Sequence, residues 1–212
     1  MNKLRRFYSE LFAAFGPQHW WPGETPLEVA VGAILTQNTN WTNVEKAIRN
    51  LRAAHALSAK RLYAMPAAEV AVLIRPAGYF TVKAKRLKAF IAFLVENYRG
   101  SMKRLKSQNT QKLRRELLSV HGIGPETADS ILLYALGKPV FVIDAYTRRV
   151  LSRHAIMHRE ESYEAFQGLF HSSLKKDVRL YNEYHALIVA VGKAFCRPRP
   201  LCARCPLSEY LP

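Results

Sequence analysis

Apolar residues recur with the helical period along almost the whole sequence, and this pattern restricts the possible folds more than any other feature. Leu27, Val31 and Ile34 mark one apolar helix face, and apolar residues at similar spacing within 87–94 mark another. The alternation that is typical of a β-strand is scarce, and the one β-branched run, Val140–Ile143, is too short to found a sheet. The sequence therefore predicts an all-α protein.

The chain carries a large excess of positive charge. Its 212 residues include 32 Lys and Arg against 16 Asp and Glu, which gives a formal net charge of +16. Such an excess is typical of proteins that bind nucleic acid, although a basic protein of another kind would show the same total. Eleven Lys and Arg lie between Lys83 and Arg115, with one acid, Glu96, among them. We interpret this basic run as a surface that binds phosphates, with a solvated helix face as the alternative.

Neither a membrane protein nor a secreted protein is indicated. The sequence has no stretch of about 18 apolar residues, and its start lacks the long apolar core and the cleavage site of a secretory signal. We expect an intracellular protein, cytoplasmic or associated with the nucleoid, that acts as a monomer.

Two helical patterns within residues 113–136 are joined by a turn that contains two glycines. Gly122 and Gly124 flank Ile123, and glycine permits backbone angles at which successive N–H groups converge on an anion. Pro125 suits the first turn of the second helix, whose N–H groups add to that attraction, and Thr127 packs behind it. Such a helix-hairpin-helix motif holds DNA phosphates without reading bases. The alternative is an ordinary turn between helices, for which one glycine usually suffices.

Gly122–Ala128 (GIGPETA) and Val142–Val150 (VIDAYTRRV) together resemble the helix-hairpin-helix glycosylase superfamily that includes endonuclease III. The resemblance extends to Ile34–Thr39, to Ala77–Ala84 and to the C-terminal cysteines, and so covers nearly the whole chain. It implies a DNA base-excision glycosylase. The expected partner is double-stranded DNA that contains a damaged base or an abasic site.

For this fold we expect two α-helical domains with a cleft between them. Residues 25–138 would form a six-helix domain that contains the hairpin at about 113–136. Residues 1–24 and 139–212 would form a second helical domain that includes the C-terminal cysteine loop, with Asp144 facing the cleft.

Asp144 is the residue that we expect to be catalytic. Breaking an N-glycosidic bond develops positive charge on the sugar, and a nearby carboxylate stabilises this charge or activates water. Asp144 follows the apolar stretch 140–143 and lies within the second motif of the resemblance. Its alternative role is an N-cap of the helix that begins at Ala145, and the two roles are compatible.

Glu126 decides which reaction we expect. In bifunctional members of the family, a lysine two residues after the second hairpin glycine forms a Schiff base with the sugar, which leads to strand cleavage. Here that position is Glu126, and a carboxylate cannot form an imine. The nearest other lysine, Lys138, lies beyond the helix and matches no family position. We therefore predict a monofunctional glycosylase without lyase activity.

The three tryptophans all lie within the first 41 residues, and two of them are candidates for a base pocket. By resemblance to the 3-methyladenine DNA glycosylase subgroup, which also carries Glu at the lysine position, Trp21, Pro22 and Trp41 would line the pocket. We place Glu126 with them. Aromatic faces hold an extruded base by stacking, and hold a cationic alkylated base more strongly. The alternative for the tryptophans is ordinary core packing.

The same resemblance predicts two residues that contact the opened duplex. Gln37 would fill the gap left by the flipped base, and Tyr79 would wedge into the opposite strand. As alternatives, Gln37 is an amide on a helix surface and Tyr79 is a packed loop aromatic. With the hairpin, the expected DNA-binding residues are Gln37, Tyr79, Gly122, Ile123, Gly124 and Thr127.

The cysteines Cys196, Cys202 and Cys205 all fall in the last 17 residues, and this odd, clustered set favours metal binding over disulfides. Their spacing resembles the 4Fe–4S loop of the family, in which four thiolates hold the cluster. The position of the fourth cysteine is Leu211 here. A 4Fe–4S cluster is therefore a possible cofactor, and degenerate cysteines that survive loss of the cluster are the alternative.

Three functions fit the sequence. The first is a monofunctional glycosylase for alkylated purines such as 3-methyladenine. The second is a glycosylase for uracil or thymine mismatches or for other damaged pyrimidines. The third is a binder of damaged DNA without catalysis, from which Asp144 distinguishes the first two.

Overall fold

The computed structural model describes residues 2–212, and within them every regular element is a helix. The chain separates into two compact units. One unit comprises Pro22–Lys138, and the other joins residues up to Trp21 with Pro139–Pro212. The all-α prediction is confirmed. Within residues 2–212, no helix has both the length and the apolar character that crossing a membrane requires.

The unit Pro22–Lys138 is built around a buried helix, α2 (Pro26–Leu35). Thr25 accepts a hydrogen bond from the N–H of Glu28 and Pro26 opens the helix, as the Thr-Pro pair suggests. All residues from Glu28 to Leu35 are buried, which is the pattern of a helix surrounded by others. Buried Glu28 is paired with Arg52, at 2.6 Å between Oε2 and Nη2.

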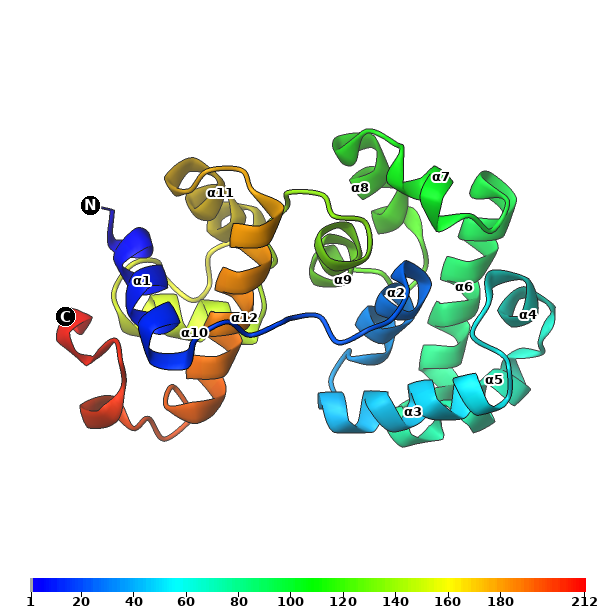
Figure 1. Cartoon of the computed structure of the whole chain (residues 1–212), viewed down its shortest axis with the longest axis horizontal. Coiled ribbons are helices and arrows are strands. Elements are labelled where there is room, and N and C mark those ends of the chain that lie inside the picture. Colours follow the sequence, from blue (N-terminus) through cyan, green and yellow to red (C-terminus); the bar gives the residue numbers. More distant parts are fainter. Residues whose placement is uncertain (1) are drawn as a thin grey trace. The chain divides into compact units, whose positions relative to one another are not determined.

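Other helices surround α2 in this unit (Figure 1). The expected number of six helices is wrong, because the unit contains eight α-helices, several of them only five to seven residues long. Besides α2 they are α3 (Trp41–Ala53), α4 (Ala59–Ala64), α5 (Ala67–Leu73), α6 (Phe80–Tyr98), α7 (Met102–Lys106), α8 (Thr110–Ser119) and α9 (Pro125–Ser130), with a 3₁₀ turn, η1 (Arg75–Ala77), before α6.

The last helix of this unit changes its winding. α9 continues into a π-helical turn, η2 (Ile131–Ala135), whose apolar residues pack against α2. A bidentate ion pair between Arg114 of α8 and Asp129 of α9, at 2.8 and 3.0 Å, fixes the two helices that flank the hairpin. The hairpin is therefore held by both apolar packing and a partly buried ion pair.

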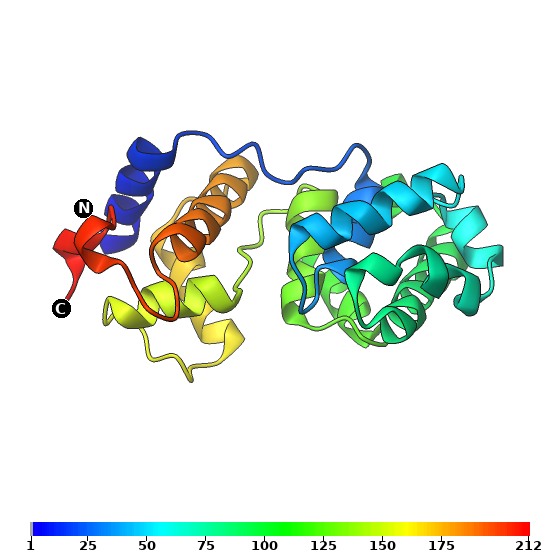
Figure 2. The ribbon, with the colours of Figure 1, turned by 90° about the horizontal axis from the view of Figure 1, so that it is seen from below.

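In its described residues, the other unit is a bundle of four α-helices with an aromatic core. They are α1 (Lys3–Phe15), α10 (Ala145–Arg153), α11 (Tyr163–Ser173) and α12 (Val178–Ala194), followed by the 3₁₀ turns η3 (Cys202–Arg204) and η4 (Ser208–Tyr210). Figure 2 shows α1 beside α12, and the hydroxyl of Tyr184 on α12 donates to the carbonyl oxygen of Leu4 at 2.7 Å. The rings of Phe141 and Phe170 stack at 3.8 Å in the core.

Candidate nucleic-acid interface and active site

The hairpin turn has the backbone conformation that two glycines permit. Gly122 has φ +81°, and a Cβ atom there would lie 2.2 Å from Cγ of Arg86. Gly124 is the N-cap of α9 and is exposed, with open space where a Cβ would lie. Ile123 between them is buried, so the turn is anchored by its apolar residue while Gly124 faces solvent.

Gln37 is bound to this hairpin. Its Nε2 donates to the carbonyl oxygen of Gly122 at 3.0 Å and to Oγ1 of Thr127 at 2.9 Å. Its Oε1 accepts a hydrogen bond of 2.5 Å from Nη1 of Arg86. The structure thus brings together three of the residues expected to contact DNA. Arg86 joins them, and the sequence had marked it only as one of eleven residues in the basic run.

Tyr79 is prominent on the surface. It is 73% exposed, which contradicts the alternative of a packed loop aromatic. It lies just before α6 with φ +46°, in the left-handed region that a bulky residue rarely adopts. Val82 in the first turn of α6 is also exposed. The start of α6 therefore presents an apolar surface to solvent, as a wedge residue requires.

Asp144 is the N-cap of α10, so this alternative role is confirmed. Its Oδ1 accepts hydrogen bonds from the backbone N–H of Thr147 at 2.7 Å and from the Thr147 hydroxyl at 2.9 Å. These bonds fix the side chain and leave Oδ2 directed elsewhere. The second carboxylate oxygen, Oδ2, is therefore not used by the cap.

His185 of α12 faces that second oxygen and was not marked as functional by the sequence. Its Nε2 lies 3.6 Å from Oδ2 of Asp144, and both side chains are largely buried. Burial lowers the pKa of His185, and the nearby Asp144 carboxylate opposes this only in part. A neutral imidazole at neutral pH adds no positive charge beside the Asp144 carboxylate.

The residues expected to line a base pocket are divided between the two units. Trp21 is in the unit that contains α12, where its ring meets that of Trp20 edge to face at 5.4 Å. Pro22, Trp41 and Glu126 are in the other unit. Trp41 opens α3 and is half-buried, while Glu126 is exposed in the first turn of α9. Their assignment to a base pocket stays a prediction.

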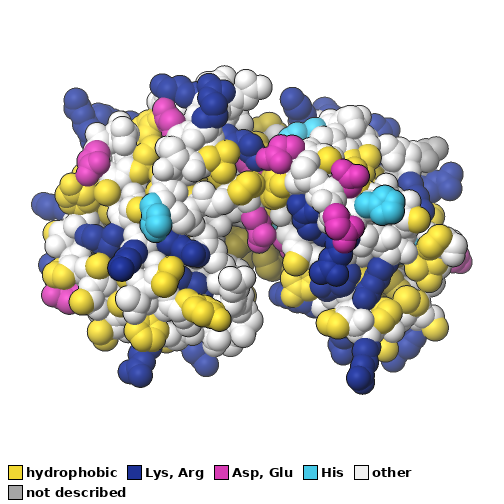
Figure 3. Space-filling view, turned by 180° about the vertical axis from the view of Figure 1, so that it is seen from behind, with side chains coloured by type: hydrophobic (Ala, Val, Ile, Leu, Met, Phe, Trp, Pro, Cys, Tyr) yellow, Lys and Arg dark blue, Asp and Glu magenta, His cyan; other side chains and the backbone are white. Residues whose placement is uncertain are grey.

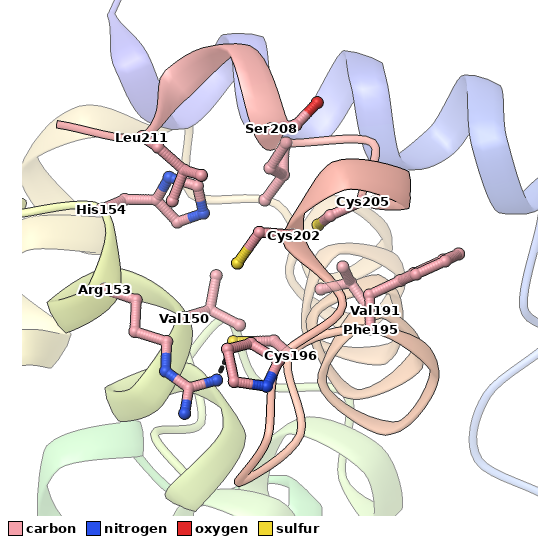
Figure 4. Close-up of a pocket in the computed structure, with 12 residues that line it drawn as sticks. Val150, Arg153, His154, Val191, Phe195, Cys196, Cys202, Cys205, Ser208 and Leu211 are labelled. Atoms are coloured by element: carbon pink, nitrogen blue, oxygen red, sulfur yellow. Dashed lines mark hydrogen bonds between the residues drawn. The ribbon is translucent and has the colours of Figure 1, made fainter.

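The three cysteines lie around one cavity near the C-terminus (Figure 4). Val150, His154 and Leu211 also line it. Cys196 is buried and Cys202 and Cys205 are half-buried. Burial raises the pKa of the Cys205 thiol, and the two other cysteines raise it further.

These residues do not fit a four-thiolate cluster. Within residues 2–212, no group of three or more His, Cys, Asp or Glu side chains is placed to hold a metal ion. The fourth position, Leu211, has no donor atom. The loop is instead held by arginines of α10. Arg153 donates to Sγ of Cys196 at 3.3 Å and to the carbonyl oxygens of Arg197 and Pro198, and Arg149 donates to the carbonyl oxygen of Cys196.

Only part of the basic run between Lys83 and Arg115 is exposed at the protein surface. Seven of its eleven residues are exposed: Lys85, Arg99, Lys103, Arg104, Lys106, Lys112 and Arg115. The other four bind within the protein: Lys83 and Lys88 donate to backbone carbonyls, Arg86 to Gln37 and Arg114 to Asp129. Figure 3 shows Lys and Arg side chains spread over the visible face of each unit. These exposed residues are available for contacts with phosphates.

Known proteins resemble this chain over most of its length. The sequence profile of the HhH-GPD superfamily base excision DNA repair proteins matches residues 31–176. A putative DNA repair glycosylase of Methanocaldococcus jannaschii is 48% identical over 98% of this chain and 94% of its own length.

Two solved structures show the same architecture. The 3-methyladenine DNA glycosylase of H. pylori, bound to 1,N6-ethenoadenine, is 29% identical with a TM-score of 0.74, over 90% of this chain and 95% of its own. Endonuclease III, trapped as a covalent intermediate with DNA, is 22% identical with a TM-score of 0.85, over 100% of this chain and 96% of its own. The latter likeness shows the fold. The chain therefore belongs to the HhH-GPD superfamily of base excision DNA repair proteins and is a DNA repair glycosylase of that family.

Proposed function

We propose that this glycosylase is monofunctional: it flips an alkylated purine such as 3-methyladenine out of duplex DNA, hydrolyses its N-glycosidic bond and leaves an abasic site. The observation that carries the proposal is Glu126 in the first turn of α9, at the position where bifunctional relatives have lysine. An imine needs an amine, and Glu126 offers only carboxylate oxygens. Water is then the nucleophile.

Asp144 supplies the charge that this hydrolysis needs. As the bond from the base nitrogen to C1′ breaks, its electrons leave with the base and positive charge develops on the sugar. The Oδ2 atom of Asp144 stabilises that charge, while Oδ1 stays bound to Thr147 and keeps the carboxylate in place. His185 supports this role because burial lowers its pKa and keeps the ring neutral, so the negative charge remains available.

Each unit has its own task in this proposal. The unit Pro22–Lys138 binds DNA: the hairpin holds phosphates, Gln37 fills the gap in the stack and Tyr79 wedges into the opposite strand. Support comes from the exposed Gly124, the bonds between Gln37 and the hairpin, and the 73% exposure of Tyr79. The other unit carries Asp144. In this proposal the chain acts as a monomer on double-stranded DNA, and we expect the reaction to take place inside the cell.

Preference for an alkylated base is supported by two observations. The H. pylori relative is named a 3-methyladenine DNA glycosylase, and this chain is similar to it over 95% of its length. Trp21 and Trp41 are half-buried and do not belong to the fully buried core. An indole ring that meets an extruded base attracts a cationic methylated base through its π face in addition to stacking. The 4Fe–4S cluster has no part in these steps, since the cysteine loop does not fit it.

The test is a release assay on duplexes that differ in one base. Purified protein is incubated with DNA containing 3-methyladenine, ethenoadenine, uracil or a thymine mismatch, and the released bases are separated by chromatography. We expect release of the alkylated purine, an abasic product that is not nicked, and no covalent adduct after borohydride. Release of uracil or thymine alone would establish the pyrimidine alternative. Binding to damaged duplex without release of any base would establish a non-catalytic binder.

A further inference from the structure

Lys83 is a buried lysine whose two hydrogen-bond acceptors lie in separate segments. Its side chain is among the largest fully buried ones, and the residue is 1% exposed. The Nζ atom donates to the carbonyl oxygen of Leu35 and to that of Ala77, each at 2.8 Å. Lys83 itself is in the first turns of α6. One side chain therefore joins three segments of the unit.

Both acceptors are the last residues of helical elements, and the functional segments follow directly. Leu35 ends α2, and residues 36–40 lead from it to α3 and carry Gln37. Ala77 ends η1, and residues 78–79 lead from it to α6 and carry Tyr79. We call residues 36–40 and 78–79 the two contact loops. In each case the carbonyl that Lys83 binds is two residues before the side chain proposed to contact DNA.

Burial of an ammonium group is unfavourable, so its presence needs a physical reason. Burial, and to a smaller extent the nearby charge of Arg86, lower the pKa of Lys83 to about 8. An apolar side chain of similar length would fill the same space without this penalty, but it would leave two carbonyl oxygens at helix ends without their donor. Lysine satisfies both oxygens, even as a neutral amine, which still has two N–H bonds.

We propose that Lys83 is a positioning residue that holds the two contact loops at a fixed separation, so that Gln37 and Tyr79 enter the opened duplex together. This inference rests on the proposed function and adds a residue to it. Gln37 and Tyr79 would act on the same site in DNA, and the separation of their loops must then match the stacked bases. A direct bond from one side chain to both loops maintains that separation without touching DNA.

The same helix offers a matched control in Lys88. Its Nζ donates to the carbonyl oxygens of Leu62, Tyr63 and Met65 at the end of α4, away from both contact loops. Lys83→Met and Lys88→Met each remove a lysine of α6 that binds carbonyls at a helix end. Both variants lose stability, and only K83M releases the contact loops.

The first measurement is independent of DNA. Hydrogen exchange of the whole chain should be faster at residues 36–40 and 78–79 in K83M, and unchanged there in K88M. The second measurement compares affinity for a duplex with an abasic-site analogue and for the same duplex without it. We expect K83M to lower this ratio roughly tenfold and K88M to preserve the wild-type ratio. Lys83→Leu, which also lacks a donor, replaces K83M if the latter does not fold, with the same expected results.

Two outcomes would overturn the proposal for different reasons. If wild-type protein prefers abasic DNA and K83M retains that preference, Lys83 does not position the loops and the proposed function stands. If wild-type protein neither releases a base nor distinguishes the two duplexes, the proposed function fails and the inference fails with it.

Discussion

The Oδ2 atom of Asp144 lies 3.6 Å from Nε2 of His185, and both side chains are largely buried in the same unit. The other oxygen of Asp144 caps α10 through Thr147. One oxygen of the carboxylate thus stabilises the helix, and the other faces a neutral imidazole. Two substitutions at Asp144 can therefore test the effect on stability and the effect on catalysis separately.

Asp144→Asn should abolish base release and leave the fold intact. Asparagine caps a helix as well as aspartate does, but it has no charge to stabilise the developing cation. Asp144→Ala should also abolish release and in addition lower the free energy of unfolding by about 0.5–2 kcal/mol, because the cap is lost. Single-turnover base release and urea denaturation measure the two effects. Full activity in D144N would contradict the catalytic role of Asp144.

The two hairpin glycines should respond differently to alanine. In Gly122→Ala the new Cβ atom meets Arg86 at a backbone angle that alanine rarely adopts, and Arg86 must move away from Gln37. We expect a loss of stability of about 1–3 kcal/mol in urea denaturation. Gly124→Ala is the control, since its φ is −89° and its Cβ would lie in open space. Equal losses in the two variants would show that strain at Gly122 is not the cause.

Glu126→Lys should introduce the chemistry that the wild type lacks. A lysine in the first turn of α9 has an amine that can form an imine with the opened sugar of an abasic site. We expect borohydride to trap E126K covalently on abasic DNA and not to trap the wild type. Glu126→Gln serves as a control without an amine. Efficient trapping of the wild type would contradict monofunctional chemistry and direct attention to another lysine.

Local patterns in the sequence predicted the features that depend on near neighbours. Thr25 and Pro26 begin α2, the glycines form the hairpin turn, and Asp144 caps α10, because each depends on residues within one helical turn. The short helices α4, α5 and α7 were not predicted individually, since five to seven residues contain too few repeats of the helical period.

Contacts between distant segments were beyond the reach of these patterns. His185 meets Asp144 only because α12 packs against α10. Lys83 and Arg86 belong to a run of basic residues that is typical of a protein surface. The fold nevertheless directs Lys83 inward to two carbonyl oxygens and Arg86 to Gln37. The pattern of charge along the sequence cannot distinguish a lysine that binds phosphate from one that donates to carbonyl oxygens at the end of a helix.

Lys83 should make stability depend on pH above neutrality. Its pKa is about 8 in the folded protein and 10.5 when unperturbed, so between these values the unfolded state holds a proton that the folded state has released. The free energy of unfolding then rises with pH in this window. Because Lys88 also has a lowered pKa, the quantity to compare is the difference between wild type and K83M in urea at pH 7 to 10.5. The free energy of unfolding of the wild type should increase relative to that of K83M as pH rises. A difference that stays constant with pH would show that Lys83 is not desolvated.

Arg153 should hold the C-terminal cysteine loop without help from a metal. Arg153→Ala removes its bonds to Cys196, Arg197 and Pro198, and we expect faster hydrogen exchange at residues 196–205 and a loss of about 1–3 kcal/mol. Arg148→Ala is the matched control, because Arg148 is on the same helix and donates to the carbonyl oxygens of Arg159 and Glu161 in a different loop. Chelation of iron should leave the Tm of the wild type unchanged, since the arginine bonds carry the conformation. A fall in Tm on chelation, with loss of iron and sulfide from the protein, would instead establish a cluster on Cys196, Cys202 and Cys205 and a fourth ligand other than Leu211.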